Sequence, residues 1–307
     1  MQPSFKSLAN SHAAKDAQAV SLEERLERCE IVYFSEAPFA IPEGDDRQFL
    51  LEQQLAHRAH KNISFDPHTH KAAGFRKSSA AESERVRSLL ESFSQNATAW
   101  LSKALPRYSA GWQLDRVSYR PAEEATRQLR LKARNDLLHV DSFPTRPTNG
   151  NRILRLFVNL NPTEVRKWVT SDPFGTLLAK YGHEVGLPGQ SQTAWNQRIH
   201  SLQEGFLRLF QPDRPVRSPY DAFMLKFHDY LKANSEFQKH GPKNYRDFPP
   251  GSAWIVFTDA VSHAVLRGRF ALEHSYFVSP EVLVLPEESP LAHLERASGI
   301  PSLRKAA

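Results

Sequence analysis

The chain has 307 residues, of which 40% are hydrophobic and 24% charged, so it is long enough for one large domain with insertions or for two smaller ones. Its single cysteine, Cys29, excludes an internal disulfide and a zinc site built on paired cysteines, and this cysteine usage favours a reducing compartment, by default the cytoplasm. The 40 Lys and Arg residues exceed the 34 Asp and Glu residues and give a net charge of +6, which favours an anionic partner such as a phosphorylated or carboxylated molecule, an acidic lipid surface or nucleic acid.

The N-terminal residues 1–20 are polar and rich in Ala and Ser, which predicts a poorly ordered tail ahead of a single domain spanning 21–307. The tail lacks the apolar run of a signal peptide. No stretch of the chain approaches the roughly 18 consecutive apolar residues that a membrane-spanning helix needs. Any contact with a membrane is therefore expected to be peripheral.

The next elements are a short strand and a long helix. "EIVYF" at 30–34 is typical of a strand. In "SERVRSLLESFSQNATAWLSKALP", at 83–106, apolar residues recur at steps of three and four, and Pro106 closes the run. That spacing predicts an amphipathic helix.

The sequence then changes to short β-branched or aromatic runs separated by Gly, Pro, Asn and Asp. These runs are "GWQLDRVSYRP", "TRQLRLKA", "LLHVD", "RILRLFVNL", "WIVFTDAVSHAVL" and "RFALEHSYFV". Most of them have no helix between them, so they predict an antiparallel sandwich or barrel rather than a parallel α/β sheet.

One region, about 165–250, departs from this β pattern and predicts a helical insertion over one mouth of the β unit. It contains two helical stretches, 193–210 and 218–237, with proline-rich joints. The second stretch has an apolar face, for which core packing is the first expectation and a lid or membrane-facing surface the alternative. This face comprises Tyr220, Phe223, Met224, Phe227, Tyr230 and Leu231.

The chain contains a candidate facial metal site. A mononuclear iron oxygenase needs three protein ligands on one face of an octahedron. His139 and Asp141 form an HxD pair at an expected strand end, and His263 is the best-placed third ligand. With 13 His and 34 acidic residues, chance predicts about 1.4 such His-x-acid pairs, and the chain has a second pair in its C-terminal tail. The pair alone therefore decides nothing, and an ordinary structural histidine remains the alternative for His139.

The strand after this pair carries polar residues in an unusual place. In "RILRLFVNLN" the two-residue period puts Arg155, Phe157 and Asn159 on one face. A buried guanidinium is costly unless an anion pairs with it, so an anionic cosubstrate is one explanation. The alternative is that this is the solvent face of an edge strand. Arg269, just beyond the turn at Gly268, is a second cation for the same role.

These motifs together resemble a known family. The order HxD, "RILRLFVNLNP", "PPGSAWIVFTD" and "SHAVLRGRFALEHSY" resembles the Fe(II)/2-oxoglutarate-dependent dioxygenases, and more closely the Kdo hydroxylases, over about 50–280. The resemblance implies a mainly β fold with helices: a double-stranded β-helix (jelly-roll) core, an N-terminal helix and the helical insertion. It also implies an enzyme that hydroxylates C3 of Kdo (3-deoxy-D-manno-oct-2-ulosonic acid) in the lipopolysaccharide inner core or Kdo-lipid A, giving Ko.

The resemblance further assigns cofactors and site residues. Fe(II) is expected on His139, Asp141 and His263, with O2 and 2-oxoglutarate as cosubstrates. For 2-oxoglutarate, Arg155 is favoured, with Asn159 beside it and Arg269 in reserve. Tentative contacts to the anionic Kdo-containing glycolipid are Arg127, Lys132, Arg134 and Arg146, and such a substrate would place the enzyme at the cytoplasmic face of the bacterial inner membrane.

Two other readings of the chain remain open at this stage. One is a 2-oxoglutarate oxygenase that acts on a protein side chain or another small molecule. The other is a non-enzymatic β-sandwich module that binds an acidic glycan or nucleic acid. The recognisable signatures of nucleic-acid-binding modules are missing, so no nucleic acid is expected.

Overall fold

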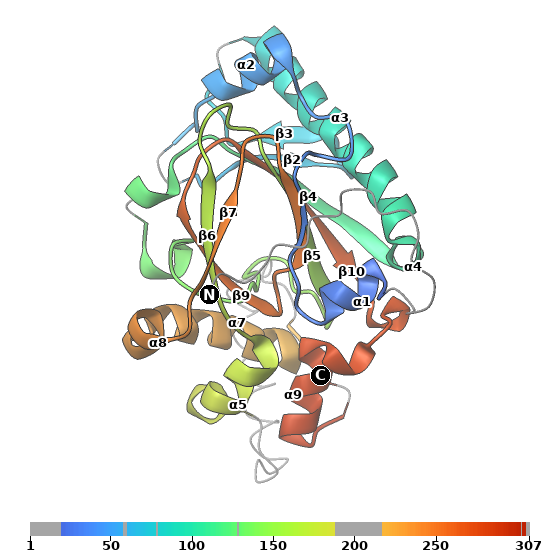
Figure 1. The fold of residues 1–307 in the computed structure, drawn as a ribbon, viewed down its shortest axis with the longest axis vertical. Helices are drawn as coiled ribbons and strands as arrows, with labels where there is room; N and C mark the ends of the chain where they lie inside the picture. The colour runs from blue at the N-terminus through green and yellow to red at the C-terminus, as the bar shows by residue number, and fades with distance from the viewer. Residues whose placement is uncertain are drawn as a thin grey trace, which may run out of the picture.

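The computed structural model describes residues 20–57, 60–77, 79–127, 129–187, 217–301 and 303–304. The expected poorly ordered tail at 1–20 lies, apart from Val20, outside the described residues. The rest of the structure is built on antiparallel sheets flanked by helices (Figure 1), as the sequence predicted for the fold class at this level.

The larger sheet has seven strands in the order β1-β8-β5-β10-β4-β2-β3. Its strands are β1 (Val32–Phe34), β2 (Ile63–Asp66), β3 (Lys71–Ala73), β4 (Trp112–Arg120), β5 (Arg152–Asn159), β8 (Ala253–Phe257) and β10 (Ala271–Val278). The smaller sheet has the order β7-β6-β9, with β6 (Arg166–Pro173), β7 (Asn244–Phe248) and β9 (Val261–Arg267). The strand β5 is central rather than at an edge, and all eight of its residues are buried, so the interpretation of its polar face as solvent-exposed is wrong.

Aromatic side chains fill the space between the two sheets. Phe157 and Trp254 project from the larger sheet and stack at 5.2 Å, while Trp168 and Phe248 project from the smaller sheet. Trp254 also stacks on Phe248, at 3.8 Å between ring centroids, and meets Trp168 edge-on. Such large rings bury much apolar area and hold the sheets at a fixed spacing.

The long helix α3 (Ala80–Ala104) covers the outer side of the larger sheet (Figure 1). The side chain of Ser79 accepts a hydrogen bond from the backbone N–H of Glu82 and so caps its first turn. Its buried residues recur at helical spacing: Val86, Leu90, Phe93, Ser94, Ala97 and Leu101. The predicted amphipathic helix is therefore confirmed, and Pro106 begins the next short helix, α4 (Pro106–Ser109).

The remaining helices gather mostly at one end of the sheets (Figure 1). They are α5 (Phe174–Val185), α7 (Pro219–Ala233), α8 (Ser235–His240) and α9 (Pro290–Ser298). Two further helices, α1 (Leu22–Glu27) and α2 (Gly44–Glu52), lie near the N-terminal part of the chain. Phe223, Met224, Phe227 and Leu231 of α7 are buried in one cluster with Val140, so the expected core packing of this face is confirmed.

Two sequence-based boundaries are corrected. The insertion expected at about 165–250 contains the strands β6 and β7, so its described helices run only between residues 174 and 240. The expected helical stretch 193–210 lies outside the described residues. The run "TRQLRLKA" is not a strand: in its place are the 3-10 turns η1 (Glu124–Thr126) and η2 (Leu131–Ala133). Charged and apolar residues alternate there, but no strand pairs with the described residues of this segment, 126–127 and 129–133.

Candidate metal centre and its surroundings

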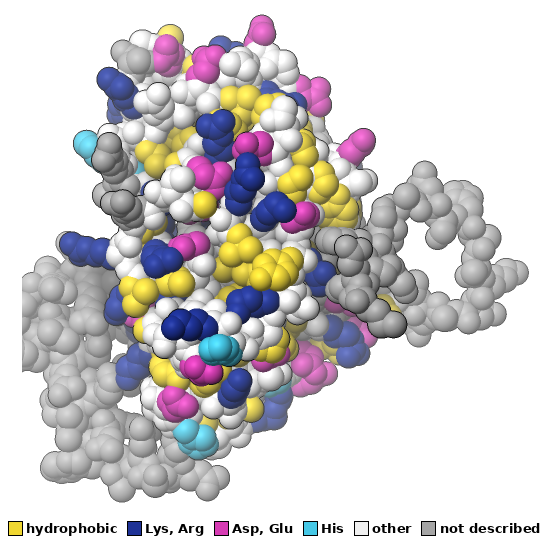
Figure 2. Space-filling view, turned by 60° about the vertical axis from the view of Figure 1, so that its left-hand side comes forward, with side chains coloured by type: hydrophobic (Ala, Val, Ile, Leu, Met, Phe, Trp, Pro, Cys, Tyr) yellow, Lys and Arg dark blue, Asp and Glu magenta, His cyan; other side chains and the backbone are white. Residues whose placement is uncertain are grey.

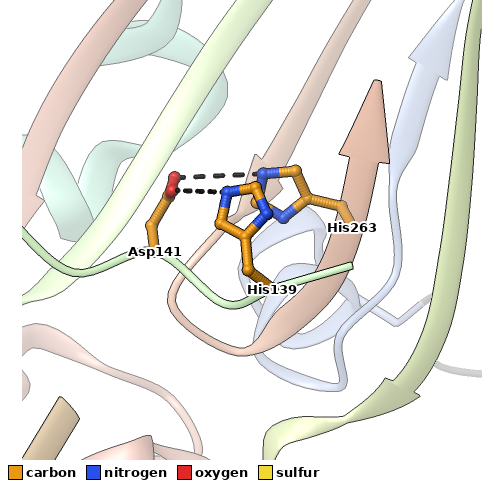
Figure 3. A group of neighbouring side chains, drawn as sticks. All are labelled: His139, Asp141 and His263. Atoms are coloured by element: carbon orange, nitrogen blue, oxygen red, sulfur yellow. Dashed lines mark ion pairs between the residues drawn. The ribbon is translucent and has the colours of Figure 1, made fainter. Parts of the chain in front are cut away.

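His139, Asp141 and His263 converge on one point at the end of the smaller sheet (Figure 3). His263 lies in β9, and the HxD segment runs beside it. The backbone N–H groups of His139 and His263 each donate to the other residue's carbonyl oxygen, at 3.1 and 2.9 Å. The N–H of Asp141 donates to the carbonyl oxygen of Thr258 at 2.8 Å. The segment of His139 and Asp141 is therefore not the regular strand that was expected. A single β-bridge between His139 and His263 places it beside β9.

The three side chains face one another and are buried. Nε2 of His139 lies 3.5 Å from Oδ1 of Asp141, and Nε2 of His263 lies 4.0 Å from Oδ2 of the same carboxylate. All the potential ligand atoms lie within 4.8 Å of one another. Two imidazoles and one carboxylate are the ligand set of non-heme iron oxygenases.

The hydrogen bonds around the two imidazoles leave the correct atoms available for a metal. Nδ1 of His139 donates to the Leu137 carbonyl oxygen at 2.7 Å, and Nδ1 of His263 donates to that of Val261 at 2.9 Å. These bonds place the lone pair of each ring on Nε2. Among the described residues, nothing donates a hydrogen bond to the buried Oδ2 of Asp141. An orphaned carboxylate oxygen between two imidazole lone pairs fits a cation.

The electrostatics also favour the protonation states that a metal requires. Burial lowers the pKa of both His139 and His263, which keeps the rings neutral. Burial by itself would raise the pKa of Asp141, but the charge of the Arg155 guanidinium holds it well below its usual range. The carboxylate is therefore ionised.

Aromatic rings support the two imidazoles from outside. Trp168 of β6 stacks on His263, with 5.1 Å between ring centroids and 20° between planes. His228 of α7 meets His139 edge-on at 5.0 Å, and its Nδ1 donates to the Val140 carbonyl oxygen at 2.8 Å. Sequence analysis did not single out either support, because each comes from an element remote from the HxD pair.

A series of buried ion pairs extends from the metal centre. Arg155 lies 3.3 Å from Oδ2 of Asp141 and 3.1 Å from Oε1 of Glu273. Glu273 in turn pairs with Arg120, which lies 3.5 Å from Glu124. Two protein carboxylates therefore lie opposite Arg155, and they offset the cost of burying its guanidinium. The expected contact between Arg155 and the cosubstrate stays a prediction.

Arg166, at the start of β6, is a different kind of buried cation. It is 1% exposed, and its Nη1 donates to the carbonyl oxygen of Gly268 at 2.8 Å. Its Nε and Nη2 have no partner within the described chain, and neither has the indole N–H of Trp168, two residues along β6. Residues two apart on a strand share a face, so these orphaned donors lie on the same side as the ring that supports His263. Unsatisfied buried donors of this kind mark a place for an anion.

The other residues predicted to bind the cosubstrate lie elsewhere. The side-chain amide of Asn159 donates to the carbonyl oxygens of Glu164 and Phe248, each at 2.9 Å, so it fastens the loop between β5 and β6. Arg269 is exposed, and its guanidinium lies over the ring of Phe270 at 4.5 Å. The structure does not bring either side chain to the metal centre.

The four predicted substrate contacts are mostly engaged with the protein. Lys132 pairs with Asp229 at 2.6 Å, Arg134 pairs with Asp136, and Arg146 pairs with Asp115. Arg127 instead donates to the backbone carbonyl oxygens of His60 and Lys61. Figure 2 shows a face on which Lys and Arg side chains are interspersed with acidic and apolar ones rather than gathered into one basic patch.

Arg127 also lines a pocket of about 610 Å³. The other described residues around this pocket are Gln53, Gln54, Leu55, His57, Pro121, Ala122, Thr126 and Leu129. Amide, imidazole and guanidinium groups in a concave site suit a polyhydroxylated ligand.

A family comparison decides what the chain is related to. The sequence profile described as 3-deoxy-D-manno-oct-2-ulosonic acid (Kdo) hydroxylase matches residues 9–301. The chain belongs to the Kdo hydroxylase family. The resemblance predicted from the sequence motifs is thus confirmed. A comparison with curated proteins finds no match.

Solved structures of a Kdo hydroxylase are similar to this chain. KdoO, a non-heme Fe(II) alphaketoglutarate dependent dioxygenase, in complex with alphaketoglutarate and Fe(III), is 32% identical, with a TM-score of 0.78 and 92% of each chain covered. Its apo structure has the same identity and TM-score, over 97% of this chain and 95% of that one. Its cobalt(II) complex gives a TM-score of 0.79.

Proposed function

We propose that this member of the Kdo hydroxylase family is an Fe(II)- and 2-oxoglutarate-dependent dioxygenase that hydroxylates C3 of Kdo in the lipopolysaccharide inner core or Kdo-lipid A, giving Ko. The observation that carries the proposal is the convergence of His139, Asp141 and His263 in a chain of this family. When bound, Fe(II) together with 2-oxoglutarate and O2 supplies the oxidation: one oxygen atom of O2 enters the sugar hydroxyl, and the other enters succinate, which forms with CO2.

The proposed fold is a double-stranded β-helix within one oxygenase domain over 21–307. Four strands of the larger sheet, in the order β8-β5-β10-β4, would form one wall. The smaller sheet β7-β6-β9, extended by the bridge between His139 and His263, would form the other. The helices of the insertion would then close the end at which the metal residues lie, as the contact between His228 and His139 supports.

The chain's own residues would hold, orient and shield the reacting groups. Nε2 of His139, Nε2 of His263 and the carboxylate of Asp141 would hold the iron, with each imidazole fixed by its Nδ1 hydrogen bond. Arg155 would fix the Asp141 carboxylate and keep it ionised. The aromatic wall around Trp168 would exclude water from this centre.

The distal carboxylate of 2-oxoglutarate would bind Arg166. Its Nε and Nη2 are adjacent donors without a partner in the described residues, which is the fork that a carboxylate accepts in a bidentate manner. The indole N–H of Trp168 is a further donor nearby. Arg155 is already engaged by two carboxylates, and Arg269 is exposed, so the earlier preference for these two arginines gives way to Arg166.

The rest of the glycolipid would extend past Arg127 into the adjacent pocket, where polar side chains face a space of about 610 Å³. In the described parts of the chain no helix is both long enough and apolar enough to cross a membrane. Access to a lipid-linked substrate would then involve peripheral contact at the cytoplasmic face of the inner membrane, favoured by the basic net charge of +6.

The proposal is tested by incubating the protein with Kdo-lipid A, Fe(II), 2-oxoglutarate and O2, and measuring succinate together with the mass of the sugar. We expect the gain of one oxygen atom in Kdo, at C3 by NMR, and loss of this product in His139→Ala. A matched control is His293→Ala, which removes the histidine of the chain's other His-x-acid pair in α9. Metal-loaded, folded wild type that forms neither product would contradict the proposal.

A further inference from the structure

We infer that the ammonium groups of Lys61 and Lys232 bind the carboxylate of the sugar substrate beside the metal centre and so make the enzyme selective for an acidic sugar. This inference rests on the proposed function, because it assigns residues to the substrate of that same reaction. Sequence analysis singled out neither lysine for this role.

Lys232 reaches the metal centre from the helix α7. It lies one turn beyond His228, so the two residues share a helix face, and His228 contacts the ring of His139. The side chain of Lys232 is buried, with the residue 3% exposed, and its Nζ donates to the carbonyl oxygen of Lys132 at 3.0 Å. An ammonium group has three donors. That carbonyl uses one of them, so a buried cation is left with unused hydrogen-bonding capacity.

Lys61 lies near the same place and comes from a different segment, just before β2. Arg127 holds its backbone through a hydrogen bond to the carbonyl oxygen at 3.0 Å. Its side chain forms no ion pair within the described residues, although Asp141, Glu124 and Arg120 lie near enough to act on its charge. Asp141 acts in the same way on Lys232. Two ammonium groups from different elements therefore lie near one metal ligand and near each other.

The charges around the metal centre do not balance in the described structure. Five cations surround the centre in the described structure: Lys61, Arg120, Arg155, Arg166 and Lys232. Three buried carboxylates oppose them: Asp141, Glu124 and Glu273. The nearby acids Asp136 and Asp229 pair with Arg134 and Lys132. Glu123 acts on Arg166 and Arg127 acts on Lys61, and these two opposite charges offset each other in the count.

An excess of two positive charges follows from this count. Fe(II) and the 2-oxoglutarate dianion would cancel each other's charge, so the excess would persist in the loaded enzyme. Arg120 and Arg155 are paired with carboxylates, and Arg166 is the proposed cosubstrate residue. Within the described residues Lys61 and Lys232 form no ion pair, so the excess is least compensated at these two ammonium groups, where it favours an anionic substrate.

The chemistry of the substrate places its carboxylate at this position. In a 3-deoxy-2-ulosonic acid the carboxyl carbon is C1, which is bonded to C2, the neighbour of the C3 that is hydroxylated. When C3 faces the metal, the carboxylate must therefore lie beside the metal centre as well. A neutral sugar of the same shape would leave both ammonium groups without a partner, which is a costly state at a desolvated site.

The test compares Kdo-lipid A with its C1 methyl ester on wild type, Lys61→Met and Lys232→Met. Equilibrium binding is measured on protein loaded with Co(II) and 2-oxoglutarate, and KM and kcat are measured on the iron enzyme. We expect each substitution to weaken binding of the acid about 10- to 100-fold and to change binding of the ester little. The KM for 2-oxoglutarate should stay the same, and the Lys→Arg variants should recover part of the acid preference.

Lys226→Met is the matched control, because Lys226 lies on the same helix but is exposed. Thermal melting confirms that each variant is folded, and the wild-type ratio of acid to ester affinity tests the inference without any substitution. An unchanged acid-to-ester ratio in both Lys→Met variants would overturn the inference. Failure of wild type to hydroxylate Kdo-lipid A would instead overturn the proposed function, while the Co(II) binding ratio would still decide the role of the lysines.

Discussion

Arg166→Met separates the cosubstrate role of this arginine from a structural one. In the ligand-free protein the buried guanidinium is destabilising, because burial, with a contribution from the charge of Arg120, lowers its pKa from the ordinary value of an arginine to about 10. At about 1.4 kcal/mol per pH unit, this shift corresponds to a cost of about 3 kcal/mol. The substitution also removes the hydrogen bond to Gly268, which lowers the free energy of unfolding by about 1 kcal/mol. Met is apolar and of similar length, so the free energy of unfolding should stay the same or rise by about 1–2 kcal/mol.

The affinity for 2-oxoglutarate should change in the opposite direction. Removing one partner of a buried, hydrogen-bonded charge pair costs about 2–5 kcal/mol, which predicts a rise of roughly 30- to 5,000-fold in the Kd and the KM for 2-oxoglutarate. Wild type loaded with Co(II), at a 2-oxoglutarate concentration of about 100 times Kd, should gain about 2.7 kcal/mol and melt roughly 4–5 °C higher. At the same 2-oxoglutarate concentration, this rise should fall to about 1.5 °C or less in Arg166→Met.

The assay is thermal melting with Co(II) and a titration of 2-oxoglutarate, followed by KM from succinate formation. Arg269→Met is the control, because that guanidinium is exposed and lies over Phe270. An Arg166→Met variant that melts higher with 2-oxoglutarate by the full wild-type amount would refute the reasoning. Loss of the rise in Arg269→Met instead would move the cosubstrate to the sequence-based alternative.

Three further outcomes are expected. Replacing Arg155 by Leu should weaken Co(II) binding roughly 10- to 100-fold in a metal titration, because the guanidinium fixes and ionises Asp141; unchanged affinity would contradict that role. His274 is fully buried against Ser94, which lowers its pKa from 6.5 to about 3, so the unfolded chain takes up a proton that the folded one does not. The contribution of His274 should leave the free energy of unfolding unchanged above pH 6.5 and lower it by about 1.4 kcal/mol per pH unit as the pH drops from 6.5 towards 3. Denaturant unfolding should show a shallower slope in His274→Gln. Gly268→Ala should lower the melting temperature, because φ is +125° and the added Cβ would lie 3.0 Å from Arg166 Cα; equal melting curves would contradict this.

The sequence determined the features that depend on local pattern. The period of α3 follows from which of its residues must be buried. The two-residue period of β5 places Leu154, Leu156 and Val158 in one core cluster and Phe157 in another, although both faces of the strand are buried. The ligands His139, Asp141 and His263 could be named because their residue types and spacing suit a facial metal site and match the family's motif order. Their convergence is in the structure, whereas their role in holding iron stays a prediction.

Only the tertiary structure decided which cations are free. Lys132 and Lys232 look alike in the sequence, yet Lys132 is exposed and paired with Asp229, while Lys232 is buried beside the metal centre. Arg155 pairs with protein carboxylates, whereas the adjacent Nε and Nη2 donors of Arg166 have no partner among the described residues. The physical reason is that the energy of a charge depends on its burial and on what faces it across space, and those neighbours come from strands and helices that are distant in the sequence.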